Sequence, residues 1–487
     1  MNRKMVLNII GKIVLTEAVL MLLPLITAVI YVETTAMYSF LITIAIAVAV
    51  GGSFMAVSRT KDTAIYAGEG FVIVGFAWII LSLIGCLPFV ISGDIPNFFD
   101  AFFETVSGFT TTGASILRDV EALSKSMLFW RSFTHWVGGM GVLVFVMAII
   151  PGTTKGSMNI MRAEMPGPVI GKLVPRLRDT AKLLYIIYMV LTLAEVILLC
   201  FGGMPLFESL VHSFGTAGTG GFGVKGDSIA GYSPYIQWVI AIFMLIFGIN
   251  FNIYYLILFR RARQVLKSTE LWVYLSIVTV SVTAIAINTS HIYNNLSDTL
   301  RNSAFQVSSI ISTTGYSTAD FDAWPGLSKA VLLLLMVIGA CAGSTAGGLK
   351  VSRVVLIFKN IGREVKQMLH PRSVNKVRFE GKTAEENTVR SVATYFGLYV
   401  VCIVVVFLLI SFETFSVGSN FETNFSAAIS CFNNIGPGFG AVGPMLNYAD
   451  YSSFSKVVLS VAMLLGRLEI FPLIIAFSPS TWMRKYR

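Results

Sequence analysis

Four short loops centred on glycine recur along the chain, and their chemistry would come from main-chain oxygens. The loops are Thr111-Thr112-Gly113-Ala114-Ser115, Thr219-Gly220-Gly221-Phe222-Gly223, Thr313-Thr314-Gly315-Tyr316-Ser317 and Asn434-Ile435-Gly436-Pro437-Gly438. The central glycines are 108, 94 and 121 residues apart, which indicates one unit repeated four times. Rings of carbonyl oxygens can replace the hydration shell of a potassium ion, and glycine most readily turns its carbonyl toward a shared axis. We expect potassium to be bound by Thr111, Thr112, Gly113, Thr219, Gly220, Gly221, Thr313, Thr314, Gly315, Asn434, Ile435 and Gly436.

A half-length helix is expected before each loop. In the first unit, Pro96–Gly108 has helix-start chemistry and an apolar face but is too short to cross a bilayer. A half-helix that enters from outside points its partially negative carboxyl end at the bilayer centre, which favours a cation there. The position thirteen residues before each central glycine is imperfectly repeated, as Asp100, Glu208, Asn302 and Thr423. The alternative is that these glycines only permit close helix packing.

The fourth loop departs from the Thr-x-Gly pattern. It places Ile435 and Pro437 around its glycine, where the other loops have a threonine or a second glycine before it. We therefore expect the four binding positions to be unequal.

The composition requires a membrane to position these loops. Of 487 residues, 55% are hydrophobic and only 13% are charged, more apolar surface than a soluble core can bury. Ten runs are close to or above the roughly 20 residues that cross a bilayer. They are Val6–Val32, Met37–Val57, Phe71–Ile91, Ser126–Ile150, Ala181–Phe201, Tyr235–Phe259, Leu271–Ile287, Lys329–Phe358, Val389–Phe412 and Phe454–Phe477.

Charge gives the expected topology, because short cytoplasmic loops collect Lys and Arg. With the amino terminus inside, the inner segments hold 28 of the 36 basic residues, including six in Thr153–Lys182 and ten in Lys350–Arg390. Both termini are then cytoplasmic. The net charge of +10 is explained by these loops, so we expect no nucleic-acid partner. The five cysteines show no paired or metal-ligand spacing and are expected to be packing residues.

A second group of candidate functional residues would lie on the inner side of the loops. The run Lys329–Phe358 is interrupted by ten small residues, Gly339–Gly348, which predicts a break inside the membrane. Arg467 lies within the last run, where its charge would oppose passing cations, and Glu469 is badly placed to pair with it. A packed small-residue face and a structural ion pair of Arg467 with another helix remain the alternatives.

These motifs carry a resemblance over nearly the whole chain. The strings are Ser107–Gly113, Arg162–Pro168, Gly343–Gly348, Asn433–Gly438 and Gly466–Phe471. The chain resembles the Trk/Ktr/HKT superfamily of potassium transporters, and within it the bacterial TrkH-type pore subunits. In related plant transporters a serine at the first filter glycine goes with sodium permeation. This chain keeps glycine at all four positions, so the resemblance implies a preference for potassium.

The resemblance implies an all-α polytopic membrane protein of the bacterial inner membrane. An amino-terminal helix pair (1–68) would precede four pseudo-fourfold repeats of helix, pore helix, filter loop and helix (69–180, 181–269, 270–388 and 389–487). An intramembrane loop would gate the pathway, surrounded by membrane lipid. The gate residues would be Gly339, Gly343, Ser344, Thr345, Gly347, Gly348, Lys350 and Arg467. The implied partners are a second copy of the chain and a cytosolic ring of nucleotide-binding regulatory subunits of TrkA type.

The expected function is a gated, potassium-selective uptake pore. The alternative is a secondary transporter that couples potassium to protons or sodium, for which Glu17 and Glu195 could form a proton relay. An enzyme acting on lipids is disfavoured, because the sequence has no clustered metal ligands, no Gly-x-Ser-x-Gly elbow and no phosphate-binding loop.

Overall fold

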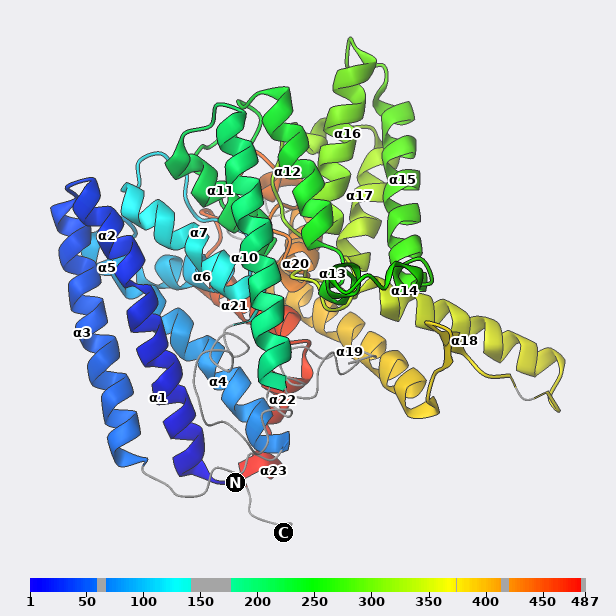
Figure 1. Ribbon diagram of the computed structural model, residues 1–487, viewed down its shortest axis with the longest axis horizontal. Coiled ribbons are helices and arrows are strands. Elements are labelled where there is room, and N and C mark those ends of the chain that lie inside the picture. The colour runs from blue at the N-terminus through cyan, green and yellow to red at the C-terminus, as the bar shows by residue number, and fades with distance from the viewer. Residues whose placement is uncertain (59–66, 142–176, 374, 413–419, 483–487) are drawn as a thin grey trace.

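The computed structural model describes residues 1–58, 67–141, 177–373, 375–412 and 420–482, and these are almost entirely helical (Figure 1). The motif 162–168 and most of the basic segment 153–182 lie outside the described residues. The helices are α1 (Arg3–Leu20), α2 (Leu22–Ile30), α3 (Thr34–Val57), α4 (Ala67–Gly85), α5 (Leu87–Ser92), α6 (Phe98–Phe109), α7 (Lys125–Gly139), α10 (Leu177–Phe201), α11 (Leu206–Gly218), α12 (Pro234–Phe247), α13 (Phe251–Leu258), α14 (Ala262–Val265), α15 (Thr269–Thr289), α16 (Leu296–Ile311), η1 (Phe321–Ala323), α17 (Gly326–Ile338), α18 (Val351–Leu369), α19 (Glu386–Ser411), α20 (Phe421–Phe432), η2 (Gly440–Val442), α21 (Ser453–Arg467), α22 (Phe471–Phe477) and α23 (Pro479–Trp482).

Several helices are long and apolar enough to cross a membrane. Among the described residues there are six such spans, or eight if two sharply bent helix pairs each count as one. The buried residues of α19 recur every three or four positions, and the apolar residues between them are left for lipid. The chain is therefore a multi-pass membrane protein, as the composition predicts.

The amino-terminal helices α1 and α3 form a closely packed pair. Gly11 and Gly51 face each other at the contact, and a Cβ built on either would lie 2.9 Å from the carbonyl oxygen of the other. Close approach through small residues is typical of membrane helices. The pair joins the rest of the molecule where α1 packs against α4 and α3 packs against α5, at the blue edge of Figure 1.

Four copies of one unit make up the remainder of the fold. Each unit has an outer helix (α4, α10, α15, α19), a short helix (α6, α11, α16, α20) and an inner helix (α7, α12, α17, α21). The inner helices α7, α12 and α17 pack against the short helices of the following units, α11, α16 and α20, and α21 returns to α6. The units therefore close into a ring, and the predicted fold class is confirmed.

Three inner helices break on the same side of the glycine loops. The chain turns by 90° between α12 and α13 and by 115° between α21 and α22, and α17 is followed by the non-helical residues 339–350. The sixth and tenth apolar runs are therefore each divided into two helices by a sharp bend. At the second bend, Glu469 and Ile470 have φ of 55° and 67°, outside the helical region.

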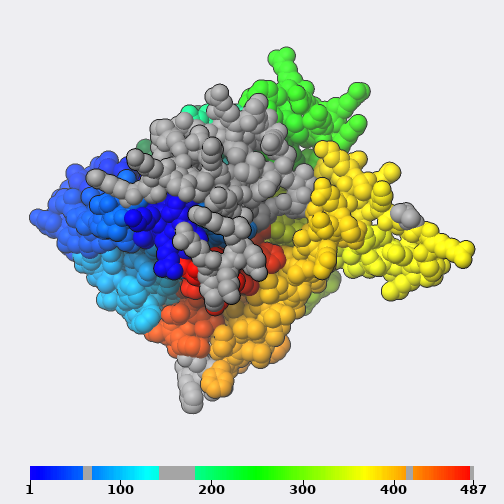
Figure 2. All heavy atoms as spheres, turned by 90° about the horizontal axis from the view of Figure 1, so that it is seen from below, coloured from blue at the N-terminus to red at the C-terminus, as the bar shows by residue number. Residues whose placement is uncertain are grey.

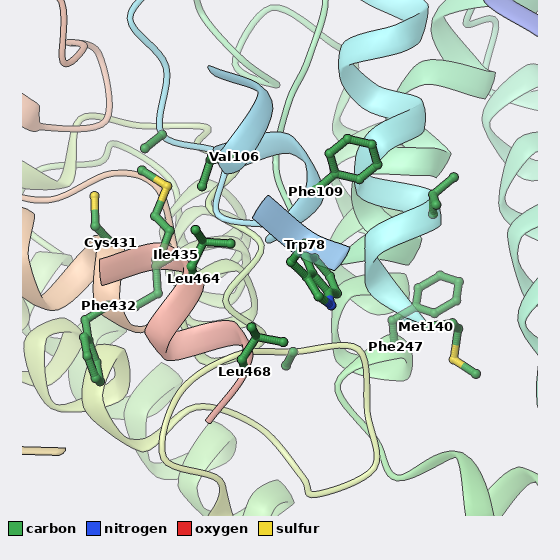
Figure 3. Close-up of a cluster of buried hydrophobic side chains, with 14 of the residues drawn as sticks. Trp78, Val106, Phe109, Met140, Phe247, Cys431, Phe432, Ile435, Leu464 and Leu468 are labelled. Atoms are coloured by element: carbon green, nitrogen blue, oxygen red, sulfur yellow. The ribbon is translucent and has the colours of Figure 1, made fainter. Parts of the chain in front are cut away.

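The core joins these units through large apolar side chains. Figure 3 shows Trp78, Phe109, Phe247, Phe432 and Leu468 in one buried cluster, although they come from α4, α6, α12, α20 and the end of α21. Each is at most 1% exposed. Since residues far apart in sequence fill the same volume, displacing one unit would open cavities beside its neighbours.

The two ends of the described chain meet on one face. The guanidinium of Arg3 lies 6.0 Å from the ring centroid of Trp482, and α1 and α23 lie together in Figure 1. Away from this face, α18 projects from the body in both views (Figures 1 and 2) and is followed by a small hairpin of β1 (Arg378–Phe379) and β2 (Lys382–Thr383).

Candidate functional site

The four short helices end in the same way. Two residues before each central glycine the backbone is left-handed, with φ of 57° in every loop, at Thr111, Thr219, Thr313 and Asn434. The following amide binds the carbonyl five residues earlier, at 2.8 Å in the first two loops and 2.9 and 3.0 Å in the others. This is a Schellman termination, which usually places glycine at the left-handed position. Threonine is strained there, and such strain marks positions where the backbone conformation serves a purpose.

The central glycines bring the four loops together. Their φ angles are 77°, 76°, 85° and 103° for Gly113, Gly221, Gly315 and Gly436. A Cβ built on each would meet a carbonyl oxygen of the next loop. The contacts are Gly113 to Gly220 at 1.9 Å, Gly221 to Thr314 at 2.1 Å, Gly315 to Ile435 at 2.0 Å and Gly436 to Thr112 at 2.8 Å. The candidate residues thus form a closed ring in the order of the chain.

The carbonyl oxygens in this ring have no protein donor. In the described part of the chain, no hydrogen bond reaches the main-chain oxygens of Thr112, Gly220, Thr314 or Ile435. All four of these residues are buried. Buried carbonyl groups are almost always paired, so four unpaired ones at one level provide acceptors for a cation.

Other carbonyl oxygens of the loops are occupied by protein groups. Tyr316 donates its hydroxyl to the oxygen of Phe222 at 3.1 Å, and Tyr448 donates to the oxygen of Gly436 at 2.8 Å. These hydroxyls fix the loops from behind.

The fourth loop is different, as its sequence predicts. Gly436 has the largest φ and the loosest contact of the four. Instead of a threonine hydroxyl, the amide of Asn434 reaches across to Thr112 Oγ1 at 3.0 Å and to the Met463 oxygen at 2.9 Å. Asn434 therefore ties the last loop to the first and to α21.

A buried ion pair that the sequence alone does not reveal supports the first two loops. Glu104 accepts hydrogen bonds from Ser115 Oγ (3.0 Å), the Ile116 amide (2.9 Å) and Arg131 Nε (2.6 Å). The side chains of Arg131 and Glu104 are only 4% and 0% exposed. Arg131 also donates to the oxygen of Gly223 at 3.2 Å, so the pair connects loop one to loop two.

Only a weak sequence signal pointed to this pair. Glu104 lies nine residues before Gly113, where the next two units have His212 and Gln306. Gln306 likewise donates to the oxygen of Ala319 beyond its loop, at 3.3 Å. A polar residue at this position therefore supports the outgoing segment in more than one unit.

The predicted break in the eighth apolar run is present. Helix α17 ends at Ile338, and Gly339, Gly343 and Gly348 have φ of 69°, 72° and 74° in the loop that follows. The amide of Val351 donates to the Ala340 oxygen at 2.9 Å, which brings the ends of the loop together. We refer to residues 339–350 as the crossing loop.

The crossing loop is seated on the inner ends of the glycine loops. The amide of Gly347 donates to Thr313 Oγ1 at 2.7 Å, and a Cβ on Gly347 would lie 2.3 Å from the oxygen of Asn433. Thr345 donates its hydroxyl to the oxygen of Phe247 at 3.3 Å. Units two, three and four therefore all contact this loop.

Arg467 adds the first unit to these contacts. Its guanidinium donates to the Thr345 oxygen at 2.8 Å and to the oxygens of Gly138 and Gly139, each at 2.6 Å. Lys350, with φ of 76°, donates to Ala346 within the crossing loop. The structure thus brings all the predicted gate residues together beneath the ring: Gly339, Gly343, Ser344, Thr345, Gly347, Gly348, Lys350 and Arg467.

Glu469 has an ion-pair partner other than Arg467, in agreement with the unfavourable spacing of these two residues for pairing on a helix. It forms an ion pair with Arg353 at the start of α18. The Arg353 guanidinium also lies 4.2 Å from the ring centroid of Tyr395 on α19. This pair joins the bend after α21 to the helix that follows the crossing loop.

The apolar spans, the ring of repeated units and the central carbonyl ring define a polytopic membrane protein built around one axis. The sequence profile of the TrkH family, described as cation transport protein, matches residues 36–272 and 255–486. The chain belongs to this family, and it is therefore a transport protein and not an enzyme.

Similar proteins cover the chain from end to end. It is 36% identical over 490 residues to the Trk system potassium uptake protein TrkH of Salmonella typhimurium, covering 99% of this chain and 100% of that protein. Identity to the Escherichia coli protein of the same name is 35% over 489 residues, with the same coverage. The crystal structure of the potassium transporter TrkH from Vibrio parahaemolyticus matches with a TM-score of 0.88 and 32% identity, over 99% of this chain and 100% of that one.

Proposed function

We propose that the chain is a potassium-selective uptake pore whose filter is the ring of four glycine loops. The observation that carries this proposal is the set of buried carbonyl oxygens that meet in cyclic order without a protein donor. Such oxygens can replace the water around an alkali cation. The relatives named as potassium uptake proteins support potassium as the ion.

Reversal potentials test the transport mechanism. The full-length protein is reconstituted in planar bilayers with a potassium gradient, and the potential is measured at several pH values and sodium concentrations. A pore gives a potential that follows the potassium gradient alone. A dependence on pH or sodium at fixed potassium indicates coupled transport instead.

One observation keeps proton coupling as a second candidate. The carboxylate of Glu17 is 2% exposed and has no hydrogen-bond partner in the part of the chain that is described. Buried ionisable groups in membranes often belong to proton pathways. The Glu17→Gln variant, measured in the same assay, distinguishes the two: a pore keeps its reversal potential, whereas a coupled transporter loses its pH dependence.

We propose that the crossing loop, with Arg467, is the gate of this pore. The loop contacts the inner ends of the third and fourth glycine loops, and Arg467 places a positive charge beside it. A cation that leaves the ring toward the inner side would meet both. In the Ser344→Cys variant, a charged thiol reagent added from the inner side should block the current, with the unsubstituted chain as control; current that persists after labelling would place this loop outside the pathway.

We propose a homodimer whose contact includes α18. Five apolar side chains at helical spacing, each at least 52% exposed, form a stripe on this projecting helix: Phe358, Ile361, Val365, Met368 and Leu369. A stripe of this size is typical of an interaction surface. The mass of the detergent-solubilised protein, measured by light scattering, tests the stoichiometry.

We further propose an inner-membrane location with both termini in the cytoplasm, where a nucleotide-binding regulatory ring of TrkA type would bind. The contact between Arg3 and Trp482 on one face supports a common side for the termini. The seven exposed basic residues between positions 359 and 390 offer a surface for such a partner: Lys359, Lys366, Arg372, Lys376, Arg378, Lys382 and Arg390. Reporter fusions at each end test the topology, and co-purification with the regulatory subunit tests the partner.

A further inference from the structure

A buried carboxylate connects the crossing loop to the start of α18. Glu270, in the first turn of α15, is 6% exposed. Its Oε1 accepts hydrogen bonds from the amide of Ala342, inside the loop, at 2.7 Å and from the amide of Ser352, at the start of α18, at 3.2 Å. One charged oxygen therefore ties the loop to the helix that follows it.

These bonds favour the seated position of the loop. Hydrogen bonds to an ionised carboxylate are stronger than neutral ones. If the loop moved away, Glu270 would lose the amide donor of Ala342 while still buried, which is costly for a charged group. The carboxylate thus stabilises the seated loop more than any displaced one.

A second carboxylate connects Glu270 to the cytoplasmic hairpin. Glu380, in the turn between β1 and β2, accepts from the amide of Glu270 at 3.0 Å and from Ser268 Oγ at 3.2 Å. An acidic group at the amino end of α15 is favoured by the helix dipole. The turn requires its unusual backbone, since Glu380 and Gly381 have φ of 49° and 73°.

The hairpin is also attached to α18. Lys359 donates its ammonium to the main-chain oxygen of Arg378 at 2.8 Å, and Phe379 is buried. The hairpin therefore contacts both elements that Glu270 connects, α15 and α18.

We propose that Glu270 is a positioning residue that latches the crossing loop, and that the 378–383 hairpin operates this latch through Glu380. The inference rests on the proposed gating role of the crossing loop. A cytosolic partner that binds the hairpin more tightly in a displaced position would shift α15 and withdraw the carboxylate from Ala342. Its differential affinity for the two positions would then set the fraction of open pores.

Single-channel recording of the full-length protein tests the latch. We expect Glu270→Ala to raise the ratio of open to closed time about 10-fold, because two charge-assisted hydrogen bonds are lost. Glu270→Gln should have a smaller effect, since it keeps one acceptor oxygen. The current through an open pore and the potassium-to-sodium permeability ratio should not change, whereas general damage to the fold would alter them.

The hairpin is tested with a matched pair of variants. Glu380→Ala should raise the same ratio, and combining it with Glu270→Ala should add little, because both act through one contact. Glu385, exposed and five residues further along, serves as the control, and Glu385→Ala should behave like the unsubstituted chain. An additive double variant, or an unchanged ratio in Glu380→Ala, would overturn the role of the hairpin.

Arg467→Ala separates failure of the latch from failure of the gate. If Arg467→Ala changes gating and Glu270→Ala does not, the latch is wrong and the gate stands. If neither changes gating, the gate itself is wrong, and the latch with it. Should Glu270→Ala not fold, Glu270→Asp keeps the charge but shortens the side chain, and an unchanged ratio in that variant overturns the latch.

Discussion

Replacing Gly113 with serine should damage potassium selectivity. A Cβ at this position would lie 1.9 Å from the carbonyl oxygen of Gly220, well inside the 3.0 Å that real Cβ atoms keep. The two atoms must therefore separate by about 1.1 Å, and the oxygen that has to move belongs to the proposed filter. The backbone adds strain, since φ is 77° and a side chain in the left-handed region costs roughly 1–2 kcal/mol.

The magnitude follows from the number of oxygens involved. Of the four carbonyl groups in the ring, only that of Gly220 would be displaced, by about 1.1 Å, while the other three stay in place. Selectivity depends on the size of the site and on the field of its carbonyl groups. We expect the potassium-to-sodium permeability ratio to fall about 10-fold, which corresponds to about 1.4 kcal/mol.

Bi-ionic reversal potentials of the purified variant measure this ratio. Gly436→Ser should have a smaller effect, because its added Cβ meets the nearest oxygen at 2.8 Å. Gly52→Ser, on α3 with no atom within 4 Å of the added Cβ, is the control for expression and folding. A folded Gly113→Ser protein with the original permeability ratio would refute the placement of this loop in the filter.

Three further predictions concern the side chains that stabilise the site and the proposed dimer contact. Arg467→Ala should raise the single-channel current or the open fraction, because it removes a positive charge and a donor to the crossing loop; unchanged currents would favour a structural role. Arg131→Ala should lower the free energy of unfolding by about 3–5 kcal/mol, because it leaves Glu104 buried without its counter-charge. Arg118 forms an exposed ion pair with Asp450, so Arg118→Ala should lower the free energy of unfolding by at most about 1 kcal/mol. Equal melting temperatures for Arg131→Ala and Arg118→Ala would contradict this reasoning. A cysteine at Ile361 should cross-link two copies in the membrane, whereas one at Lys359, which faces the hairpin of its own chain, should not.

The repeated loops and the break after α17 could be predicted because their signals are local. Glycine and threonine at fixed offsets indicate a special backbone, and ten small residues in a row make a poor helix. The structure places both where the sequence predicts them. The exact limits of the four repeats and the ion-binding role of the loops stay predictions.

Other features left no comparable trace in the sequence. The bends after α12 and α21 lie inside continuous apolar runs, so hydropathy alone shows one span in each case. Glu104 and Arg131 are 27 residues apart, on helices whose packing decides that they meet. In the sequence, Glu270 is an ordinary acidic residue in the first turn of a helix, and only tertiary packing brings the amides of Ala342 and Ser352 to its carboxylate.

The sequence by itself determined that the chain is a membrane protein, that one unit occurs four times and that glycine occupies four equivalent positions. Tertiary structure alone decided which carbonyl oxygens meet. Each contact of the ring joins residues that are about a hundred or more positions apart, such as Gly113 and Gly220 or Gly436 and Thr112. Hydropathy and backbone preference act within a few residues, whereas a ring closes only when all four units pack against one another.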